Sequence, residues 1–203
     1  MPPSQTITKE KILDAALTIV RTEGIERLSA RNIAKTLKCS TQPIYSTFKN
    51  MEILEKAVIQ KAFRFIIDNY MIGYKPTDNN FLNMGLSSIE IARKEQKLFQ
   101  MLYLSGKVRI DFENNVFPFD KDELIAGMKK DPFLAELGKE RRERILFNMW
   151  IYTHGLSALV NANPSISNDF IFTALDEMGR IVIEWEFMQK MKEQSEPDHR
   201  DEI

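Results

Sequence analysis

The sequence predicts an all-α protein. Apolar residues recur at helical intervals of three and four along almost the whole chain of 203 residues, and no segment shows the strict alternation of a half-buried strand. With 43% hydrophobic residues, the chain can bury one compact body or a small domain joined to a larger one. The later prolines, which would break a helix interior, fall between or after the helical patterns: Pro118, Pro132, Pro164 and Pro197.

The first predicted helix follows Thr8 and ends before Gly24. Thr8 is a typical N-cap, and Ile7 and Ile12 stand around it at the positions of a hydrophobic staple. Gly24 stands where a residue in the left-handed conformation commonly ends a helix. The apolar face of this helix is formed by Ile12, Leu13, Ala16, Leu17 and Val20.

Two shorter helices with the same kind of start signal follow. Ser29 is predicted to cap a helix over 30–37, and Ser40 a helix over 41–48. Pro43 then falls at the third helical position, where its missing N–H has no intrahelical acceptor to lose. The third helix is expected to turn Ile44, Tyr45 and Phe48 inward and to leave uncharged polar groups outside: Thr41, Gln42, Ser46 and Thr47.

A longer helix is expected from Asn50 to Gly73, with Glu52 favourably placed near its positive end. The turn-rich segment 74–80 separates it from a second block of helices. The predicted helices of that block are Phe81–Glu95, Leu98–Ser105, Asp122–Lys130, Arg142–Ala162 and Asn168–Gln194.

Charge is distributed unevenly along the chain. Residues 1–50 hold eight basic and four acidic side chains, a net +4, whereas the whole chain carries −1, so the remainder carries −5. The basic N-terminal part is therefore the part expected to meet phosphates. Cys39 is the single cysteine, which excludes an intrachain disulfide. Without a signal-peptide core or an apolar run of roughly 20 residues, a cytoplasmic protein with no membrane contact is expected.

Three short helices within about fifty residues, the last two joined by a short turn, are typical of a helix-turn-helix unit. In such a unit the third helix lies in the major groove, where glutamine pairs with adenine and threonine bonds a base or touches the thymine methyl group. The first N–H groups of the second helix, together with Arg31, would form an anion site. An ordinary helical hairpin accounts for the pattern equally well, with Tyr45 and Phe48 as core aromatics and Ser29 and Ser40 as simple caps.

The segment 12–54 resembles the DNA-binding head of tetracycline-repressor (TetR-type) transcription regulators. The resemblance is carried by a spaced set of residues: Ile12, Leu13, Ala15, Ala16, Gly24, Ser29, Ile33, Ala34, Ser40, Ile44, Tyr45, Phe48, Glu52 and Leu54. It implies a helix-turn-helix DNA-binding domain at 1–54 and a helical ligand-binding and dimerisation domain at 55–203. The family usually has Gly and Val where Lys38 and Cys39 stand, and often Lys where Met51 stands.

The same resemblance, with the chemistry above, defines the expected DNA contacts. Ser29 and Arg31 would hold the backbone, the first residues of the third helix would face bases, and Tyr45 and Lys49 would bind phosphate. The full set is Ser29, Arg31, Lys38, Ser40, Thr41, Gln42, Pro43, Tyr45, Thr47 and Lys49.

The segment 150–156, WIYTHGL, looks like the Trp–His–Gly signature of one TetR-type subgroup. Trp150 and His154 lie one helical turn apart. The family resemblance implies a small-molecule pocket among the middle helices, and Met and Phe walls suit a largely apolar effector. The candidate lining residues are Phe99, Met101, Leu102, Tyr103, Phe147, Trp150, Ile151 and His154. An ordinary core, with a hydrogen-bonded interior histidine, explains these residues as well.

The last helix carries a long apolar stripe. By resemblance, it and the preceding helix pair with their symmetry mates in a four-helix bundle, with burial inside the monomer as the alternative. The candidate dimer residues are Gly155, Ala158, Ala174, Met178, Ile181, Val182 and Trp185.

These observations together predict a homodimeric transcription regulator. In this family such a protein is most often a repressor, released from an inverted-repeat operator in double-stranded DNA by a small, largely apolar effector. No glycine-rich phosphate loop or metal-ligand spacing is present, and no histidine lies near Cys39 in sequence. We therefore expect no enzyme activity, cofactor or metal. A helical interaction module without DNA binding is the alternative, which Lys38 and Met51 favour.

Overall fold

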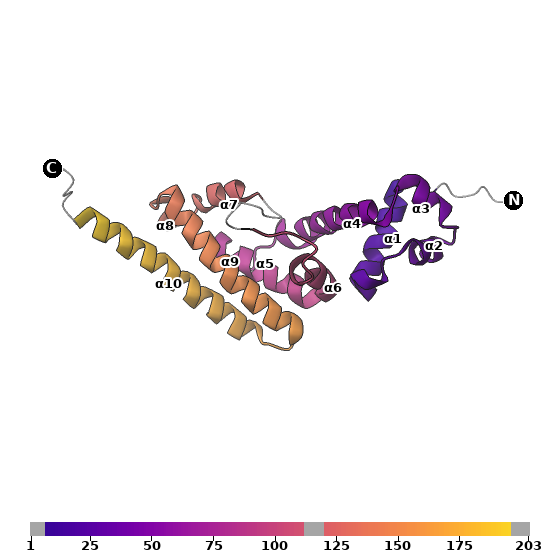
Figure 1. Cartoon of the computed structure of the whole chain (residues 1–203). Coiled ribbons are helices and arrows are strands. Elements are labelled where there is room, and N and C mark those ends of the chain that lie inside the picture. Colours follow the sequence, from indigo (N-terminus) through magenta and orange to yellow (C-terminus); the bar gives the residue numbers. More distant parts are fainter. Residues whose placement is uncertain (1–6, 112–119, 196–203) are drawn as a thin grey trace, which may run out of the picture. The chain divides into compact units, whose positions relative to one another are not determined.

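The structure is all-α, which confirms the predicted fold class. The computed structural model describes residues 7–111 and 120–195, and helices make up about 78% of it (Figure 1). Within those two ranges no strand occurs. The segments 1–6, 112–119 and 196–203, which include Pro118 and Pro197, lie outside the described residues.

Packing divides the chain into two compact units. Unit 1 comprises residues 1–72 and 91–118, and unit 2 comprises residues 73–90 and 119–203. The boundary expected after Leu54 falls inside α4 (Met51–Ile66), and α4 packs against the first helix of the chain. Packing therefore groups all of α4 with the N-terminal helices.

Unit 1 is organised around its first helix, α1, which packs against α2, α4 and α6. Ile12, Ile33 and Leu54 meet in its core and are fully buried. Helices this short are marginal in water by themselves, so this shared core stabilises all of them. In chain order the elements are α1 (Lys9–Glu23), η1 (Ile25–Arg27), α2 (Ala30–Leu37), α3 (Gln42–Thr47), α4, η2 (Ile67–Met71), α6 (Gln96–Phe99) and η3 (Gln100–Leu104).

Local sequence signals fix most helix ends in unit 1. The predicted caps Thr8 and Ser29, and Asn50 before α4, each accept a hydrogen bond from the backbone N–H three residues later. Gly24 ends α1 with φ +95°, and its N–H donates to the carbonyl of Val20. Its ψ of 167° differs from the left-handed helical conformation that the sequence suggested.

Two predicted helices change type before they end. The helix expected to continue to Gly73 is α-helical only to Ile66 and continues as the π-helical segment η2. The helix expected over 98–105 is the short α6 followed by the π-helical segment η3. After η2 the N–H of Ile72 donates to the carbonyl of Ile67 at 2.9 Å, five residues back. An apolar period near 3.6 residues does not distinguish such bonds from α-helical ones.

Unit 2 is a helical bundle in which α9 and α10 run antiparallel, side by side (Figure 1). A Cβ atom placed on Gly85 of α5 would lie 3.3 Å from Leu175 of α10 and 3.6 Å from the Thr153 hydroxyl of α9. The glycine thus allows α5 to approach both helices closely. The elements are α5 (Asn80–Lys94, of which 91–94 belong to unit 1), α7 (Lys121–Met128), α8 (Pro132–Ala135), α9 (Lys139–Ala162) and α10 (Asn168–Ser195).

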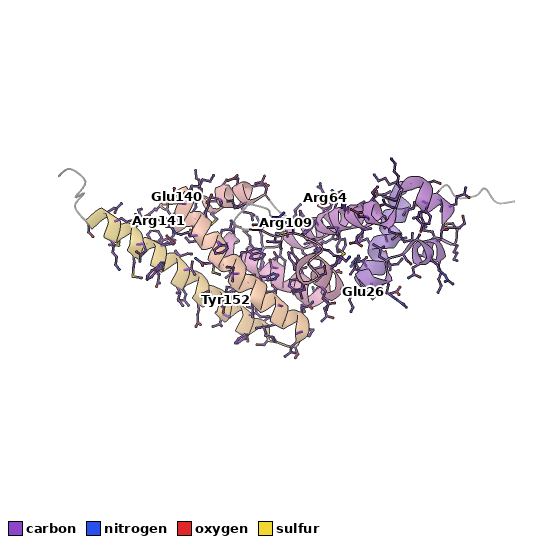
Figure 2. All side chains as sticks on the ribbon, in the orientation of Figure 1. Glu26, Arg64, Arg109, Glu140, Arg141 and Tyr152 are labelled. Carbon is purple, nitrogen blue, oxygen red and sulfur yellow. The ribbon has the colours of Figure 1, made fainter. Side chains whose placement is uncertain are left out.

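A buried carboxylate links α9 to α10. Glu186 accepts hydrogen bonds from Arg144 Nε at 2.8 Å and Nη2 at 2.7 Å, and from Arg141 Nη1 at 3.0 Å. Arg141 lies towards the N-terminal end of α9 (Figure 2). The bonds from Arg144, and then those from Arg141, hold the pKa of Glu186 below its usual range against the opposing effect of burial. An unpaired charge here would be costly, so the cluster favours one register of α9 on α10.

Glu186→Gln should lower the free energy of unfolding by about 3 kcal/mol near pH 7, because Arg144 would lose its buried partner and Arg141 would keep only Glu193. The folded-state pKa of Glu186 is depressed, so its contribution is complete above the ordinary glutamate pKa of about 4.3 and is lost as the pH falls through the lower folded value. Denaturant unfolding at several pH values measures this difference. Glu184→Gln, at an exposed carboxylate of the same helix, is the matched control. A gap between wild type and Glu186→Gln that did not shrink in acid would contradict the assignment.

Candidate nucleic-acid interface

A Schellman motif closes α2 and begins the connection to α3. The N–H of Cys39 donates to the carbonyl of Ala34 at 3.0 Å, and the N–H of Lys38 donates to that of Lys35 at 3.3 Å. Lys38 has φ +53° and ψ +43°, and among the described residues it is the only non-glycine with positive φ. Glycine adopts this turn conformation more easily than lysine. Residues 38–41 form the four-residue connection between α2 and α3.

The start of α3 differs from the prediction. Thr41, and not Ser40, is the N-cap residue, with helical φ −76° and ψ −12° and no side-chain cap hydrogen bond. Pro43 consequently stands at the second helical position, one earlier than predicted and still within the first turn. The Schellman bonds hold Lys38 and Cys39 against α2, so Ser40 still belongs to the connection and the helix begins one residue later.

α3 has one buried side and one exposed side. Ile44 and Phe48 are 1% and 3% exposed and belong to the core of unit 1. With roughly 3.6 residues per turn, Gln42 and Ser46 lie nearly opposite that pair, and both are exposed. Tyr45 is 52% exposed, so the prediction that it faces inward is wrong. One residue step rotates its side chain by about 100° away from Ile44, which takes it out of the core.

Two hydroxyl groups of α3 are bonded to the helix itself. Ser46 Oγ donates to the carbonyl of Gln42 at 2.9 Å, and Thr47 Oγ1 donates to the carbonyl of Pro43 at 2.8 Å. A hydroxyl carries a single hydrogen, so both groups keep only acceptor capacity towards the outside. No hydrogen bond within the described part of the chain engages the side-chain amide of Gln42, which keeps both donors and its acceptor.

The start of α2 combines a cap with open backbone donors. Ser29 Oγ accepts the N–H of Asn32 at 3.2 Å, and the Asn32 amide donates to the carbonyl of Arg27 at 2.7 Å. The first-turn N–H groups of Ala30 and Arg31 have no intrahelical acceptor. Nothing in the sequence singles out Asn32, because its bond to Arg27 depends on the path of the preceding loop.

The residues predicted to contact DNA all lie at the surface of unit 1. Two are half-buried, Ser29 and Pro43, and the others are exposed: Arg31, Lys38, Ser40, Thr41, Gln42, Tyr45, Thr47 and Lys49. The structure adds Lys9 of α1, which the sequence marks only as one of several basic residues. Its Nζ atom lies 5.9 Å from the centre of the Phe48 ring, which brings a positive charge close to α3.

A second buried carboxylate holds α1 within unit 1. Glu95 accepts bonds from Arg21 Nε at 2.9 Å and Nη2 at 2.6 Å, and from the Tyr70 hydroxyl at 2.8 Å. The Arg21 guanidinium also lies 4.1 Å from the centre of the Phe65 ring. The bond to Glu95 raises the pKa of Arg21. These contacts fix α1 without using the exposed side of α3.

Three of the four ligand candidates of unit 1 lie in its interior, and the fourth, Tyr103, is half-buried. Phe99, Met101 and Leu102 are buried. The Tyr103 ring lies 5.2 Å from that of Phe99 and meets the Phe63 ring edge-on at 6.4 Å. Burial raises the pKa of Tyr103 to about 12. This packing agrees with the alternative of an ordinary core.

The other ligand candidates lie on α9 in unit 2. The rings of Trp150 and His154 are stacked, with centroids 4.9 Å apart and planes 8° apart. Both are half-buried, and desolvation lowers the pKa of His154, which favours a neutral imidazole at pH 7. Phe147 and Ile151 of the same helix are exposed.

An apolar stripe on α9 and α10 is in part left uncovered by the described part of the protomer, whereas its members Ala174, Met178 and Val182 pack against the core of unit 2. Ile181 is 60% and Trp185 55% exposed. Gly155 is exposed as well, and a Cβ atom placed there meets nothing within 4 Å in the described structure. The remaining candidates are half-buried: Ala158, Ala174, Met178 and Val182. Further exposed apolar residues on these two helices, which the predicted set leaves out, are Leu159, Phe170, Phe172, Met188 and Met191.

The chain matches no protein-family model and no curated protein. Across residues 7–111 and 120–195, no helix is long and apolar enough to span a bilayer. The same residues contain no group of three or more His, Cys, Asp or Glu side chains arranged to hold a metal ion.

Lys38→Gly should raise the free energy of unfolding by about 0.5–1 kcal/mol. Glycine adopts the left-handed conformation without steric cost, and its greater freedom in the unfolded chain offsets only part of that gain. Lys35→Gly is the matched control, since Lys35 is an exposed residue inside α2, and it should lose about 1 kcal/mol. Chemical denaturation of both variants measures the difference. Destabilisation by Lys38→Gly would contradict the turn described above.

Proposed function

We propose that the protein is a homodimeric, ligand-responsive transcription regulator of the tetracycline-repressor type, which represses by binding double-stranded DNA. The observation that carries this proposal is the division of α3 into a buried apolar side and an exposed side of uncharged polar groups. Amide and hydroxyl groups of this kind match the edges of bases in the major groove. The resemblance of the segment 12–54 to the DNA-binding head of that family supports the same conclusion.

The width of α3 suits the major groove. An α-helix with its side chains is about 10–12 Å across, and the groove is about 12 Å wide. Gln42, at the centre of the exposed side, would pair with N6 and N7 of an adenine. Thr41 and Pro43 stand beside it in the first turn and would lie against neighbouring bases.

Phosphate contacts would come from both sides of α3. The hydroxyl of Tyr45 and the ammonium groups of Lys38 and Lys49 are exposed next to the helix. At the start of α2, Arg31 stands with open N–H groups at the positive end of the helix dipole. The Ser29 hydroxyl already accepts a bond from the helix and keeps its hydrogen for a phosphate oxygen. Such contacts set the register of α3 on the duplex.

Two copies would pair through the apolar stripe of α9 and α10. Ile181 and Trp185 expose large apolar side chains. Large exposed apolar patches on proteins commonly mark sites where another protein binds. A two-fold axis would place α9 and α10 of each copy against the same pair in its partner, in a four-helix bundle. The two α3 helices would then bind the halves of an inverted repeat.

A small, largely apolar molecule would release the repressor from DNA. The stacked pair Trp150 and His154 offers an aromatic wall with one neutral polar group, a combination common in ligand sites. An effector lowers DNA affinity only if it binds more tightly to a form whose two heads no longer match the operator. Such a protein would work in the cytoplasm, with access to DNA.

Tyr45→Ala should weaken binding to a duplex taken from upstream of the protein's own coding sequence by about tenfold or more, because one hydrogen bond to a charged phosphate is lost in each half-site. Fluorescence anisotropy at fixed salt measures the affinity. Lys129→Ala, at an exposed residue of unit 2, is the control and should bind as wild type does. Equal effects of the two substitutions would contradict the assignment of α3 as the DNA-binding element.

Trp185→Arg should weaken dimerisation by at least about 30-fold, because a charged group would replace a central aromatic contact. Phe133→Arg is the matched control, since Phe133 is a strongly exposed aromatic residue on α8, outside the stripe. Sedimentation velocity over a concentration series gives the dissociation constants, and circular dichroism shows whether both variants stay folded. A monomeric wild type, or equal weakening by both variants, would contradict the proposed interface.

A further inference from the structure

Thr47 is the last residue of α3 and offers a base either a hydroxyl group or a methyl group. Its Oγ1 donates to the carbonyl of Pro43 at 2.8 Å. Donating that hydrogen to a base would break an existing hydrogen bond to form another, with little net gain, so Oγ1 keeps only its capacity to accept. Because the hydroxyl hydrogen is already engaged by the Pro43 carbonyl, the methyl group is favoured as the part of Thr47 that contacts DNA.

The branching of threonine places the methyl group on the open side. Oγ1 and Cγ2 occupy different staggered positions on Cβ, so an Oγ1 held against the helix backbone leaves Cγ2 for an approaching partner. Thr47 is exposed and lies about 100° around the helix from Ser46, at the flank of the exposed side of α3. Ser46 makes the same bond to the helix but has no methyl group, so it presents only an acceptor.

We infer that Thr47 selects a thymine in each half-site through methyl–methyl contact in the major groove, and not through a hydrogen bond. Thymine is the base that presents a C5 methyl group there. This inference rests on the proposed DNA-binding function and assigns part of its specificity. Within α3, the Gln42 amide and the Thr47 methyl group then carry the discrimination between bases.

Two conservative substitutions separate the methyl group from the hydroxyl group. Wild-type protein is first used to select its preferred duplex from synthetic random-sequence DNA, which contains no methylated cytosine. Thr47→Val, which keeps a methyl group and loses the hydroxyl, should bind the selected duplex as wild type does. Thr47→Ser, which keeps the hydroxyl and its bond to the helix, should bind about fourfold more weakly per half-site, or ~15-fold with two half-sites.

The matching change in the DNA identifies the contacted base. Replacing the two symmetry-related thymines of the selected duplex together by deoxyuridine, one such pair at a time, removes only their C5 methyl groups. At one position per half-site this change should weaken wild-type binding as much as Thr47→Ser does, and it should weaken Thr47→Ser no further. Thr18 is the matched control, because its hydroxyl donates to the Asp14 carbonyl at 2.9 Å on an exposed face of α1. Thr18→Val and Thr18→Ser should both bind as wild type does.

The outcomes distinguish this inference from the proposed function. If Thr47→Val loses affinity and Thr47→Ser keeps it, with unchanged thermal melting, the hydroxyl makes the contact and the inference is overturned. It is also overturned if no deoxyuridine position affects the wild type. If wild-type protein selects no sequence at all, the proposed function fails together with the inference. Coincident losses from Thr47→Ser and from one deoxyuridine position support the methyl contact.

Discussion

A helix of six residues does not persist in water through its own hydrogen bonds, because nucleation costs more than so few bonds return. α3 is helical because Ile44 and Phe48 are buried in the core of unit 1, where each gains roughly 2 kcal/mol from leaving water. The same two side chains fix the rotation of α3 about its axis. Once they are inside, Gln42 and Ser46 must be outside. The orientation of the polar face therefore follows from the burial of two apolar residues.

The sequence predicts best those features that depend on close neighbours along the chain. The caps at Thr8 and Ser29 follow from bonds that span three residues, and the structure contains both. The start of α3 is predicted one residue early because it depends on how the chain leaves α2. That exit is a Schellman motif with Lys38 at the position where glycine is the usual signal. The π-helical segments η2 and η3 escape prediction because their bonds leave no distinct apolar period.

The candidate site shows where sequence patterns stop being informative. Tyr45 is an aromatic residue between the buried positions Ile44 and Phe48, so the sequence alone suggests a core residue. Its side chain is nevertheless rotated out of the core. Lys9 of α1 comes within 5.9 Å of the Phe48 ring only in the folded unit, and no spacing in the sequence records that approach. On α9 the sequence does not reveal the exposed apolar stripe, for another reason. Apolar residues occur on both its packed side, as at Leu156, and its open side, as at Ile151, so periodicity alone does not identify the uncovered face.

Two buried carboxylates do the same physical task, one in each unit. Glu95 accepts bonds from Arg21 and Tyr70, and Glu186 from two arginines of α9. A buried ion pair adds little net stability over an apolar pair, but it disfavours every arrangement that would leave a charge unpaired. Each cluster therefore favours one packing of its helices. A single defined packing of this kind is what the proposed function requires. If the helices of each unit packed loosely, the two α3 helices of a dimer would adopt spacings that fit the operator and spacings that do not. An effector would then bind these forms with nearly equal affinity and could not shift the balance between them.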